Sequence, residues 1–481
     1  MEQFLQKQDI AFIVPELELA VFGMFLLIFD LMVKTKRRLG YVALIGVGVS
    51  GFFLFKLWNV GKHYAYNGAL VIDPLAMFFK LIFLIAAALS IAISLKYLDI
   101  EHENHGEYYA LILFATMGMM FMAGATDLVT LYIGLETMAI STYILVGFLR
   151  GNQRSNEASM KYFLLGAFSS AFLLYGMSLL YGIAGRSGFE DIKAALSHRP
   201  PTDPISLMAM ITISAGMFFK VAAVPFHQWT PDAYEGAPAS ITAFMSVAVK
   251  AASFAMMIRV FMVVLAPLQP QWVTVMAAVS IMTMTVGNIA AITQSNIKRL
   301  LAYSSISHAG YILIGFIAGN DTGLTAVGLY LLIYAFTNIG VWSLVVALRR
   351  KDIIGEHIDD MAGLFFKHPT AAVLMLIFLL SLAGIPPTAG FIGKYYLFAA
   401  AIQTGHNTLA VIAVLNAAIS LYFYFRIVVS MFMRDATERT GMVFAPGLTV
   451  VLGVAVLVTM FIGIYPDPFI ALAQYAMPSG F

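Results

Sequence analysis

Three lysines of this sequence stand inside long apolar stretches, where a charged side chain is costly. They are Lys220, Lys250 and Lys394. A lysine at the centre of a bilayer costs at least ~2.5–3.5 kcal/mol on insertion scales, so three of them in one chain point to a function. Burial shifts the pKa of an amine by up to ~3–5 units, which allows proton binding and release near neutral pH. We therefore predict that these lysines carry protons.

A carboxylate accompanies the lysines. Glu136 stands in the apolar segment Leu-Tyr-Ile-Gly-Leu-Glu-Thr-Met-Ala. Desolvation would neutralise a lone carboxylate there, whereas a nearby Lys220 would keep both groups charged until a proton arrives or leaves. The alternative is a static structural ion pair.

His308 is the histidine that lies inside an apolar stretch. Its segment, Tyr-Ser-Ser-Ile-Ser-His-Ala-Gly-Tyr, is rich in hydroxyl groups. The imidazole is suited to relay protons, because it titrates near neutral pH. A hydrogen-bonded contact between helices explains the same pattern equally well.

Five further cations lie near the ends of apolar stretches. They are Lys56, Lys80, Lys161, Arg259 and Arg426. Long basic side chains near a span end usually reach back to the membrane interface or pair with another helix. We expect one of these two roles for each of the five.

The composition places the chain in a membrane. Charged residues make up 11% and apolar residues 60%, whereas a soluble domain has roughly 25% charged residues. The absence of cysteine from the sequence excludes disulfides, thiolate zinc sites and cysteine-ligated iron–sulfur clusters. The histidines lie mostly in loops, so a bis-histidine haem is not expected. We expect no cofactor, metal or redox centre on this chain, and a net charge of +2 gives no case for nucleic acid.

The apolar runs predict an all-α integral membrane protein with about fourteen transmembrane helices. Two runs contain helix-breaking prolines, one at Pro225 and Pro231 and the other at Pro386 and Pro387. Broken helices at membrane depth are tolerated where the freed backbone is buried in protein or lines a cavity, which is where transporters place ion sites.

The two breaks divide the chain into corresponding parts. Each break falls in the fourth helix of a set of five. Because five is odd, the second set begins on the opposite side of the membrane and is inverted relative to the first. The predicted organisation is three N-terminal helices (1–104), a first five-helix repeat broken near Pro225 (105–264), a second, inverted repeat broken near Pro386 (265–435), and a C-terminal helix (436–481).

The loop charges predict the orientation. With the N-terminus outside, fifteen cations fall on the cytoplasmic side: Lys34, Lys36, Arg37, Arg38, Lys96, Arg150, Arg154, Lys298, Arg299, Arg349, Arg350, Lys351, Lys367, Arg434 and Arg439. Five fall on the opposite side: Lys7, Lys62, Arg186, Lys193 and Arg199. This bias follows the positive-inside rule and places both termini on the periplasmic side of a bacterial inner membrane.

Three segments carry a resemblance to a known family. Residues 220–238 read Lys-Val-Ala-Ala-Val-Pro-Phe-His-Gln-Trp-Thr-Pro-Asp-Ala-Tyr-Glu-Gly-Ala-Pro, and residues 296–308 and 390–395 contain Asn-Ile-Lys-Arg-Leu-Leu-Ala-Tyr-Ser-Ser-Ile-Ser-His and Gly-Phe-Ile-Gly-Lys-Tyr. They resemble the antiporter-like membrane subunits of proton-pumping NADH:quinone oxidoreductase (respiratory complex I), the subunit N branch in particular. The resemblance covers nearly the whole chain in matching order and spacing.

The resemblance implies a role for each candidate residue. Glu136 matches the modulating glutamate and Lys220 the lysine of the first broken helix. Lys250 and Lys394 match relay lysines, and His308 lies where the family has a polar group linking the halves. The implied partners are other membrane subunits of complex I, including neighbouring antiporter-like subunits, with FMN and iron–sulfur clusters on partner subunits of the peripheral arm.

Two other functions compete with this interpretation. A subunit of a multi-subunit monovalent cation/proton antiporter would share the fold and the buried lysines, although Tyr234-Glu-Gly and the position of Lys394 favour complex I. A structural membrane scaffold predicts that neutralising the lysines leaves transport intact.

The charge census generates a topology prediction. A reporter enzyme that is active only in the periplasm, fused after Phe481, should be active, because the census places that end outside. The same reporter fused after Arg150 should be silent. A silent periplasmic reporter at Phe481, together with a signal there from a reporter that works only in the cytoplasm, would overturn the orientation.

Overall fold

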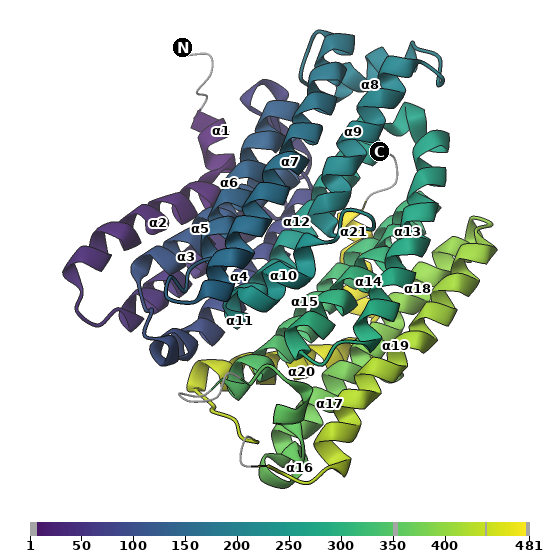
Figure 1. Cartoon of the computed structure of the whole chain (residues 1–481). Helices are drawn as coiled ribbons and strands as arrows, with labels where there is room; N and C mark the ends of the chain where they lie inside the picture. The colour runs from purple at the N-terminus through teal and green to yellow at the C-terminus, as the bar shows by residue number, and fades with distance from the viewer. Residues whose placement is uncertain (1–6, 350–354, 438–439, 478–481) are drawn as a thin grey trace.

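The structure is a computed structural model that describes residues 7–349, 355–437 and 440–477. Arg350, Lys351, Arg439 and Phe481, which entered the charge census and the topology prediction, lie outside the described residues. The remainder is nearly all helical (Figure 1).

The elements follow one another along the chain in three groups. The first is α1 (Lys7–Phe12), α2 (Val14–Met32), α3 (Arg37–Leu57), β1 (His63–Ala65), η2 (Tyr66–Gly68), β2 (Leu70–Ile72), α4 (Pro74–Glu101), α5 (Gly106–Gly124), α6 (Leu128–Val146), α7 (Gln153–Ala184) and α8 (Phe189–Ser197). The second is α9 (Pro204–Val221), α10 (Trp229–Gly236), α11 (Ala239–Phe244), η3 (Met245–Val249), α12 (Lys250–Met257), η4 (Ile258–Val264), η5 (Ala266–Leu268), α13 (Gln269–Ile292), α14 (Ile297–Ala318) and α15 (Asp321–Leu348). The third is η6 (Ile358–Met361), α16 (Leu364–Lys367), α17 (Pro369–Ala383), α18 (Ala389–Gln403), α19 (Asn407–Met433), α20 (Pro446–Ile464) and α21 (Asp467–Ala476).

The prediction of an all-α integral membrane protein is confirmed. Twelve helices among the described residues are long and apolar enough to cross a membrane. α17 is a shorter apolar helix, and α2 carries three carboxylates within 19 residues. The count of fourteen and the inverted repeats stay predictions.

Short polar residues start many of these helices. Asp73 accepts a hydrogen bond from the backbone N–H of Ala76 at 2.8 Å and so begins α4. Side chains of Asp127, Asn152 and Asn296 cap α6, α7 and α14 in the same way. A cap occupies backbone donors that have no partner inside the helix, which fixes where each helix begins.

Both proline-containing runs are interrupted. α9 ends at Val221, where Ala222 adopts a left-handed conformation with φ 62°, and the short α10 follows before α11. α17 ends at Ala383, and α18 starts at Ala389 after Gly384 with φ 84°. A Cβ on Gly384 would also lie 2.7 Å from the Lys394 side chain, so glycine is required there.

The helix from α11 to η4 departs from the regular geometry expected for it. Two π-helical segments, η3 and η4, flank the α-helical α12. Lys250 is the first residue after η3. π-Helical turns are rare and frequent at functional sites, because they re-aim the side chains that follow them.

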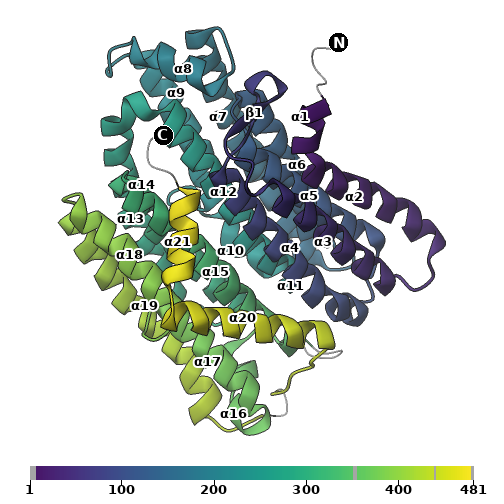
Figure 2. The same cartoon turned by 180° about the vertical axis from the view of Figure 1, so that it is seen from behind.

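The most buried helices form the centre of the molecule. α15 and the α11–η4 helix are fully enclosed and α14 nearly so, whereas α3, α7, α19 and α20 present one face outward. Leu31, Phe55 and Met433 are 77–88% exposed, which suits a lipid-facing surface. Figure 2 shows α20 lying across the back of α15, with α21 turning away from its end.

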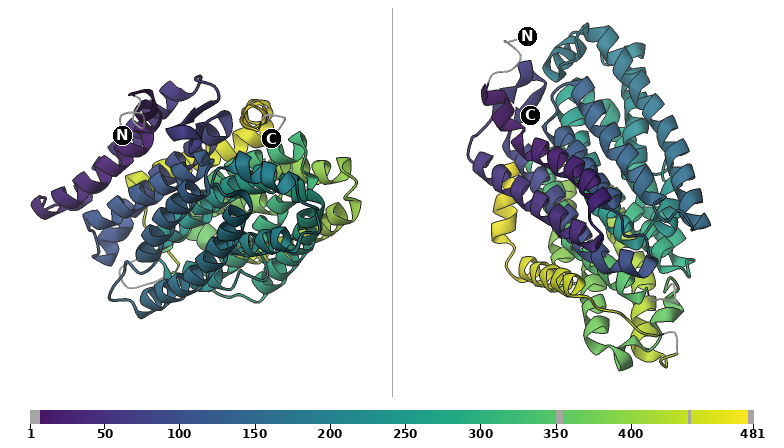
Figure 3. Two further views of the ribbon diagram at one scale, coloured as in Figure 1. Left: turned by 90° about the horizontal axis from the view of Figure 1, so that it is seen from above. Right: turned by 90° about the vertical axis from the view of Figure 1, so that its left-hand side faces the viewer.

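The two ends of the molecule carry different structures. The β1–β2 hairpin, α1 and α8 lie at one end, which we call the hairpin face (Figures 2 and 3). The C-terminal end of α4, the N-terminal ends of α7 and α14, and the C-terminal end of α15 share a polar cavity, which defines the opposite face.

Candidate functional site

Lys220 lies in the last turn of α9, immediately before the first break. Its Nζ donates a hydrogen bond to the Tyr143 hydroxyl of α6 at 3.4 Å. Backbone groups that the break frees have hydrogen-bond partners. Trp229 Nε1 donates to the Phe219 carbonyl at 2.9 Å, and the Val224 N–H donates to Thr283 Oγ1 at 2.9 Å. Side chains of α10 and α13 therefore bond to the backbone groups that the break frees, and the amine of Lys220 has a hydroxyl partner.

Glu136 lies on α6, seven residues before Tyr143. Ser170 Oγ donates to its Oε1 at 2.5 Å. Residues seven apart share a helix face, so Glu136 and Tyr143 point the same way from α6. Within the described residues Glu136 and Lys220 make no direct ion pair, and it is the Tyr143 hydroxyl that contacts the amine.

Lys250 bonds to α14. Its Nζ donates to both the backbone oxygen and the hydroxyl of Ser305. The ring of Tyr334 lies with its centroid 5.7 Å from the same nitrogen. A single residue of α14 therefore supplies both oxygen partners of this amine.

His308 follows Ser305 by one turn of α14. Its Nδ1 lies 2.6 Å from the Tyr330 hydroxyl and its Nε2 lies 3.1 Å from the Tyr424 hydroxyl. Tyr424 also contacts Ser304 Oγ at 2.5 Å. A neutral imidazole donates at one nitrogen and accepts at the other, so this arrangement can pass a proton across the ring.

Lys394 lies on α18, after the second break. Its Nζ donates to the carbonyls of Leu382 at 3.0 Å and Ala383 at 2.8 Å. These are carbonyls at the C-terminal end of α17, where no intrahelical partner exists and the helix dipole favours a cation. The amine lies 4.9 Å from the ring centroid of Tyr311, and a cavity of about 620 Å³ borders the side chain.

α14 aligns the second half of this site. Ser305, His308 and Tyr311 are three residues apart and therefore lie along one face of the helix. They contact Lys250, the Tyr330 and Tyr424 hydroxyls, and Lys394 in that order. All four buried groups, the three lysines and His308, are only 3–4% exposed. The structure thus brings Lys250, His308 and Lys394 into one row, with Lys220 and Glu136 on α9 and α6.

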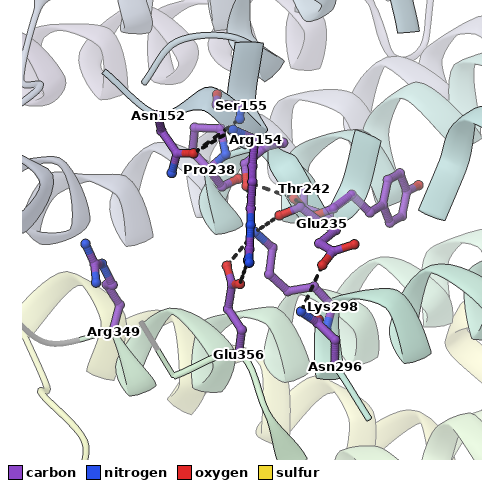
Figure 4. Close-up of polar contacts among 12 residues, drawn as sticks. Asn152, Arg154, Ser155, Glu235, Pro238, Thr242, Asn296, Lys298, Arg349 and Glu356 are labelled. Atoms are coloured by element: carbon purple, nitrogen blue, oxygen red, sulfur yellow. Dashed lines mark hydrogen bonds and ion pairs between the residues drawn. The ribbon is translucent and has the colours of Figure 1, made fainter. Parts of the chain in front are cut away.

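A second polar cluster surrounds a cavity of about 370 Å³ on the opposite face from the hairpin (Figure 4). Lys298 Nζ donates to the carbonyls of Glu235 and Ala237 and lies 3.3 Å from Glu356 Oε1. Figure 4 shows Arg154 reaching the same carboxylate, at 3.5 Å. These contacts tie α7, α10 and α14 together below the first break.

Residues 229–238, which belong to the stretch that resembles the complex I subunits, contribute the neighbouring part of this cluster. Arg299 lies 2.9 Å from Asp232 and 2.8 Å from Glu235, and Lys161 lies 3.0 Å from Asp232. Both carboxylates of α10 are therefore held by cations. Since α14 carries Arg299 as well as His308, the position of α10 is linked to the helix that aligns the buried row.

The five cations near span ends divide into two groups: three form ion pairs, and two contact backbone carbonyls or an aromatic ring. Lys80 pairs with Glu16 and Arg259 with Asp73, both fully buried, and Lys161 pairs with Glu157 and Asp232. Arg426 donates to the carbonyls of Ile292 and Gln294, and Lys56 lies 4.5 Å from the ring centroid of Phe52.

The sequence did not identify the hydroxyl groups that bond to the candidate titratable residues. Tyr143, Ser305, Tyr330 and Tyr424 contact the titratable groups, yet the chain has 22 tyrosines and many serines in apolar runs. A hydroxyl inside a span usually satisfies its own helix backbone. A titratable residue has to be placed first before its hydroxyl partner can be recognised.

Comparison with known proteins agrees with the geometry. The family model described as "NADH:quinone oxidoreductase/Mrp antiporter, TM" matches residues 125–420. The chain is 51% identical to NADH-quinone oxidoreductase subunit N 2 of Solibacter usitatus, over 98% of each chain. It superposes on a chain of respiratory complex I from Thermus thermophilus with a TM-score of 0.82 and 30% identity, covering 96% of this chain and 100% of the other. A chain of the Mrp complex from Dietzia shares the fold, with a TM-score of 0.85 at 22% identity over 97% of this chain and 96% of the other.

The α10–α14 contact generates a stability prediction. Replacing Arg299 by Met leaves Asp232 and Glu235 without their shared guanidinium, and we expect a loss of roughly 1–2 kcal/mol, because hydrogen bonds to charged groups are stronger than neutral ones. Thermal unfolding of the purified protein in detergent measures it. Lys193→Met is the matched control, since Lys193 lies 3.9 Å from Glu190 at the surface of α8. Equal unfolding temperatures for both variants would contradict the role assigned to Arg299.

Proposed function

This chain belongs to the NADH:quinone oxidoreductase/Mrp antiporter membrane family, and from that membership we propose that it is subunit N of a respiratory complex I. In this role it translocates protons across the membrane while electron transfer takes place on other subunits. The observation that carries the proposal is the row of Lys250, His308 and Lys394 aligned by one face of α14.

The row supports stepwise proton movement. Lys250 and Lys394 each hold a proton on an amine, and the hydroxyls of Tyr330 and Tyr424 offer His308 a donor and an acceptor on either side. Imidazole accepts a proton at one nitrogen and releases one from the other, so it can connect two amines without changing its position. Lys250 and Lys394 are the relay lysines of this proposal, and His308 is the relay between them.

In this proposal, Lys220 is the proton-loading site, the residue that takes up the proton to be transported. A proton crossing a potential of ~200 mV requires about 4.6 kcal/mol, at ~2.3 kcal/mol per charge per 100 mV. That energy corresponds to a change in proton affinity of roughly 3.4 pKa units. Shifts of this size are reached by groups withdrawn from water and not by surface groups. Lys220 is buried and has one hydroxyl partner, Tyr143, so small movements at the α9–α10 break change its surroundings.

The partners and the location follow from the same proposal. Neighbouring antiporter-like subunits would cover the chain in the membrane, and subunits of the peripheral arm would carry FMN and iron–sulfur clusters. The charge census supports insertion in a bacterial inner membrane with both termini outside. The chain itself contains no cysteine for a cluster.

A cation/proton antiporter subunit is the second candidate, favoured by the fold shared with the Mrp complex. It differs from the first in requiring a cation gradient. Proton translocation driven by NADH in sodium-free medium supports complex I, and transport that needs sodium supports the antiporter. A structural scaffold predicts that neither buried lysine nor carboxylate affects transport.

The Glu136 side chain generates a pumping prediction. We expect Glu136→Gln to lower the ratio of protons pumped to NADH oxidised, because the negative charge that acts on Lys220 from α6 is lost. Ser170 can still donate to the amide oxygen, so the fold is kept. Proton uptake by membrane vesicles measures the ratio. An unchanged ratio in a fully assembled complex would leave Glu136 with a structural role.

Lys220 generates the second pumping prediction. Lys220→Ala and Lys220→Arg should each reduce coupled transport by more than roughly tenfold, since a positioned proton-transfer group contributes ~10²–10⁴-fold to a rate. Arginine fails because its guanidinium does not release a proton. Lys56→Ala, at an exposed span end, should pump at the parental ratio. If both Lys220 variants assemble and pump like the parent, Lys220 is not a loading site.

A further inference from the structure

A serine joins the two halves of the second broken helix. Ser381 lies in the last turn of α17, and its Oγ accepts a hydrogen bond from the backbone N–H of Gly390 at 3.0 Å. Gly390 is the second residue of α18, so its N–H is one of the donors that have no partner inside that helix. Ser381 therefore caps α18 from the other side of the break.

The residue that precedes α18 does not provide this cap. Thr388 stands at the N-cap position, but its side chain makes no capping bond, and its Oγ1 donates to the Ile385 carbonyl at 2.7 Å. An N-cap hydroxyl normally accepts from the second or third N–H of its helix, and Ser381 Oγ takes that place. Glycine is required at position 390 for this approach, because a Cβ there would collide with the Ser381 carbonyl.

A threonine of the central helix contacts the same hydroxyl. Thr337 of α15 has its Oγ1 3.1 Å from Ser381 Oγ, and both residues are only 1% exposed. Hydroxyl groups in spanning helices usually bond to a carbonyl of their own helix. In the part of the chain that the structure describes, Ser381 and Thr337 bond to other helices instead. The two hydroxyls therefore connect α15, α17 and α18 at one point.

This point lies next to the partners of Lys394. The carbonyls that accept from Lys394 Nζ, at 3.0 and 2.8 Å, belong to the two residues that follow Ser381. Lys394 follows Gly390 by four residues, which is about one turn of α18. The Ser381–Gly390 bond is thus one turn from the amine on α18 and beside its acceptors on α17. Loss of this bond would let α18 shift against α17 and change the distance between the amine and those carbonyls.

The same face of α15 bears a partner of His308. Tyr330, whose hydroxyl lies 2.6 Å from His308 Nδ1, stands seven residues before Thr337, so the two share a helix face. Tyr330 also packs against α18, since a Cβ on Gly393 would lie 2.8 Å from its ring. α15 therefore contacts the histidine and both halves of the second broken helix.

We propose that Ser381 is a positioning residue for Lys394, and that the Thr337 hydroxyl holds Ser381 in place. The Ser381 hydroxyl keeps the N-terminal end of α18 against the C-terminal end of α17, which sets the distance from the Lys394 amine to the carbonyls of α17. The contribution of Ser381 to proton transfer rests on the proposed function of the chain.

Pumping by the assembled complex tests the role of Ser381. Lys394→Ala gives the reference ratio of protons pumped to NADH oxidised when the relay amine is absent. We expect Ser381→Ala to lose about half or more of the difference between the parent and that reference, because one hydrogen bond changes a population by roughly two- to tenfold. Ser420→Ala is the matched control and should pump like the parent, since Ser420 is also buried but its hydroxyl bonds to the Ala417 carbonyl of its own helix.

A parental ratio for Ser381→Ala would overturn the proposal. If Lys394→Ala pumps less than the parent in the same series, the failure concerns Ser381 alone. If Lys394→Ala is parental as well, the relay function proposed for Lys394 fails with it.

Two substitutions of Thr337 separate a hydrogen bond from packing. Thr337→Ser keeps the hydroxyl and loses the methyl group, whereas Thr337→Val keeps the shape and loses the hydroxyl. Positioning through the hydroxyl predicts that Thr337→Val lowers the pumping ratio while NADH oxidation continues, and that Thr337→Ser pumps like the parent. A packing role predicts the reverse. If Thr337→Val pumps no worse than Thr337→Ser, the role assigned to the hydroxyl is wrong.

Discussion

The cost of placing an ammonium group in the membrane interior is the constraint on which this structure depends. Water is not available to solvate the lysine, so oxygen atoms of the protein have to replace it. The three central lysines meet this need differently: Lys220 uses a tyrosine hydroxyl, Lys250 both oxygens of one serine, and Lys394 the end carbonyls of α17. None of the three has a carboxylate within ion-pair distance among the described residues.

The helix breaks follow from the same constraint. A continuous helix satisfies its own carbonyls and offers none to a side chain, whereas a helix that ends inside the membrane exposes its last carbonyls to a cation. The second break uses this directly for Lys394. At the first break, the freed backbone groups instead bond to Trp229 and Thr283, and Lys220 bonds to the Tyr143 hydroxyl. The two breaks thus share an architecture while providing different surroundings for their lysines.

α14 sets the order of Lys250, His308 and Lys394 in the buried row. One face of this helix carries His308 and contacts Lys250 and Lys394, and its first turn carries Lys298 and Arg299 in the charged cluster. Ion pairs therefore connect α10 at the first break to α14, and α14 in turn positions the buried row. A rigid, nearly fully buried helix is suited to this, because packed interiors move as units.

The sequence by itself determined the membrane class, the two helix breaks and the family, and it predicted the five candidate proton-carrying residues, because apolar run length, proline and the insertion cost of a charge are local properties. The tertiary structure alone decided the partners. The Tyr143 hydroxyl, on the same face of α6 as Glu136, is the group that contacts Lys220, and Glu16 pairs with Lys80 across 64 positions of the chain. Hydroxyl groups and span-end charges are too common to be assigned from their neighbours in sequence. Whether such a group is solvated, paired or left with a free oxygen depends on which helices pack together, and that is a property of the whole fold.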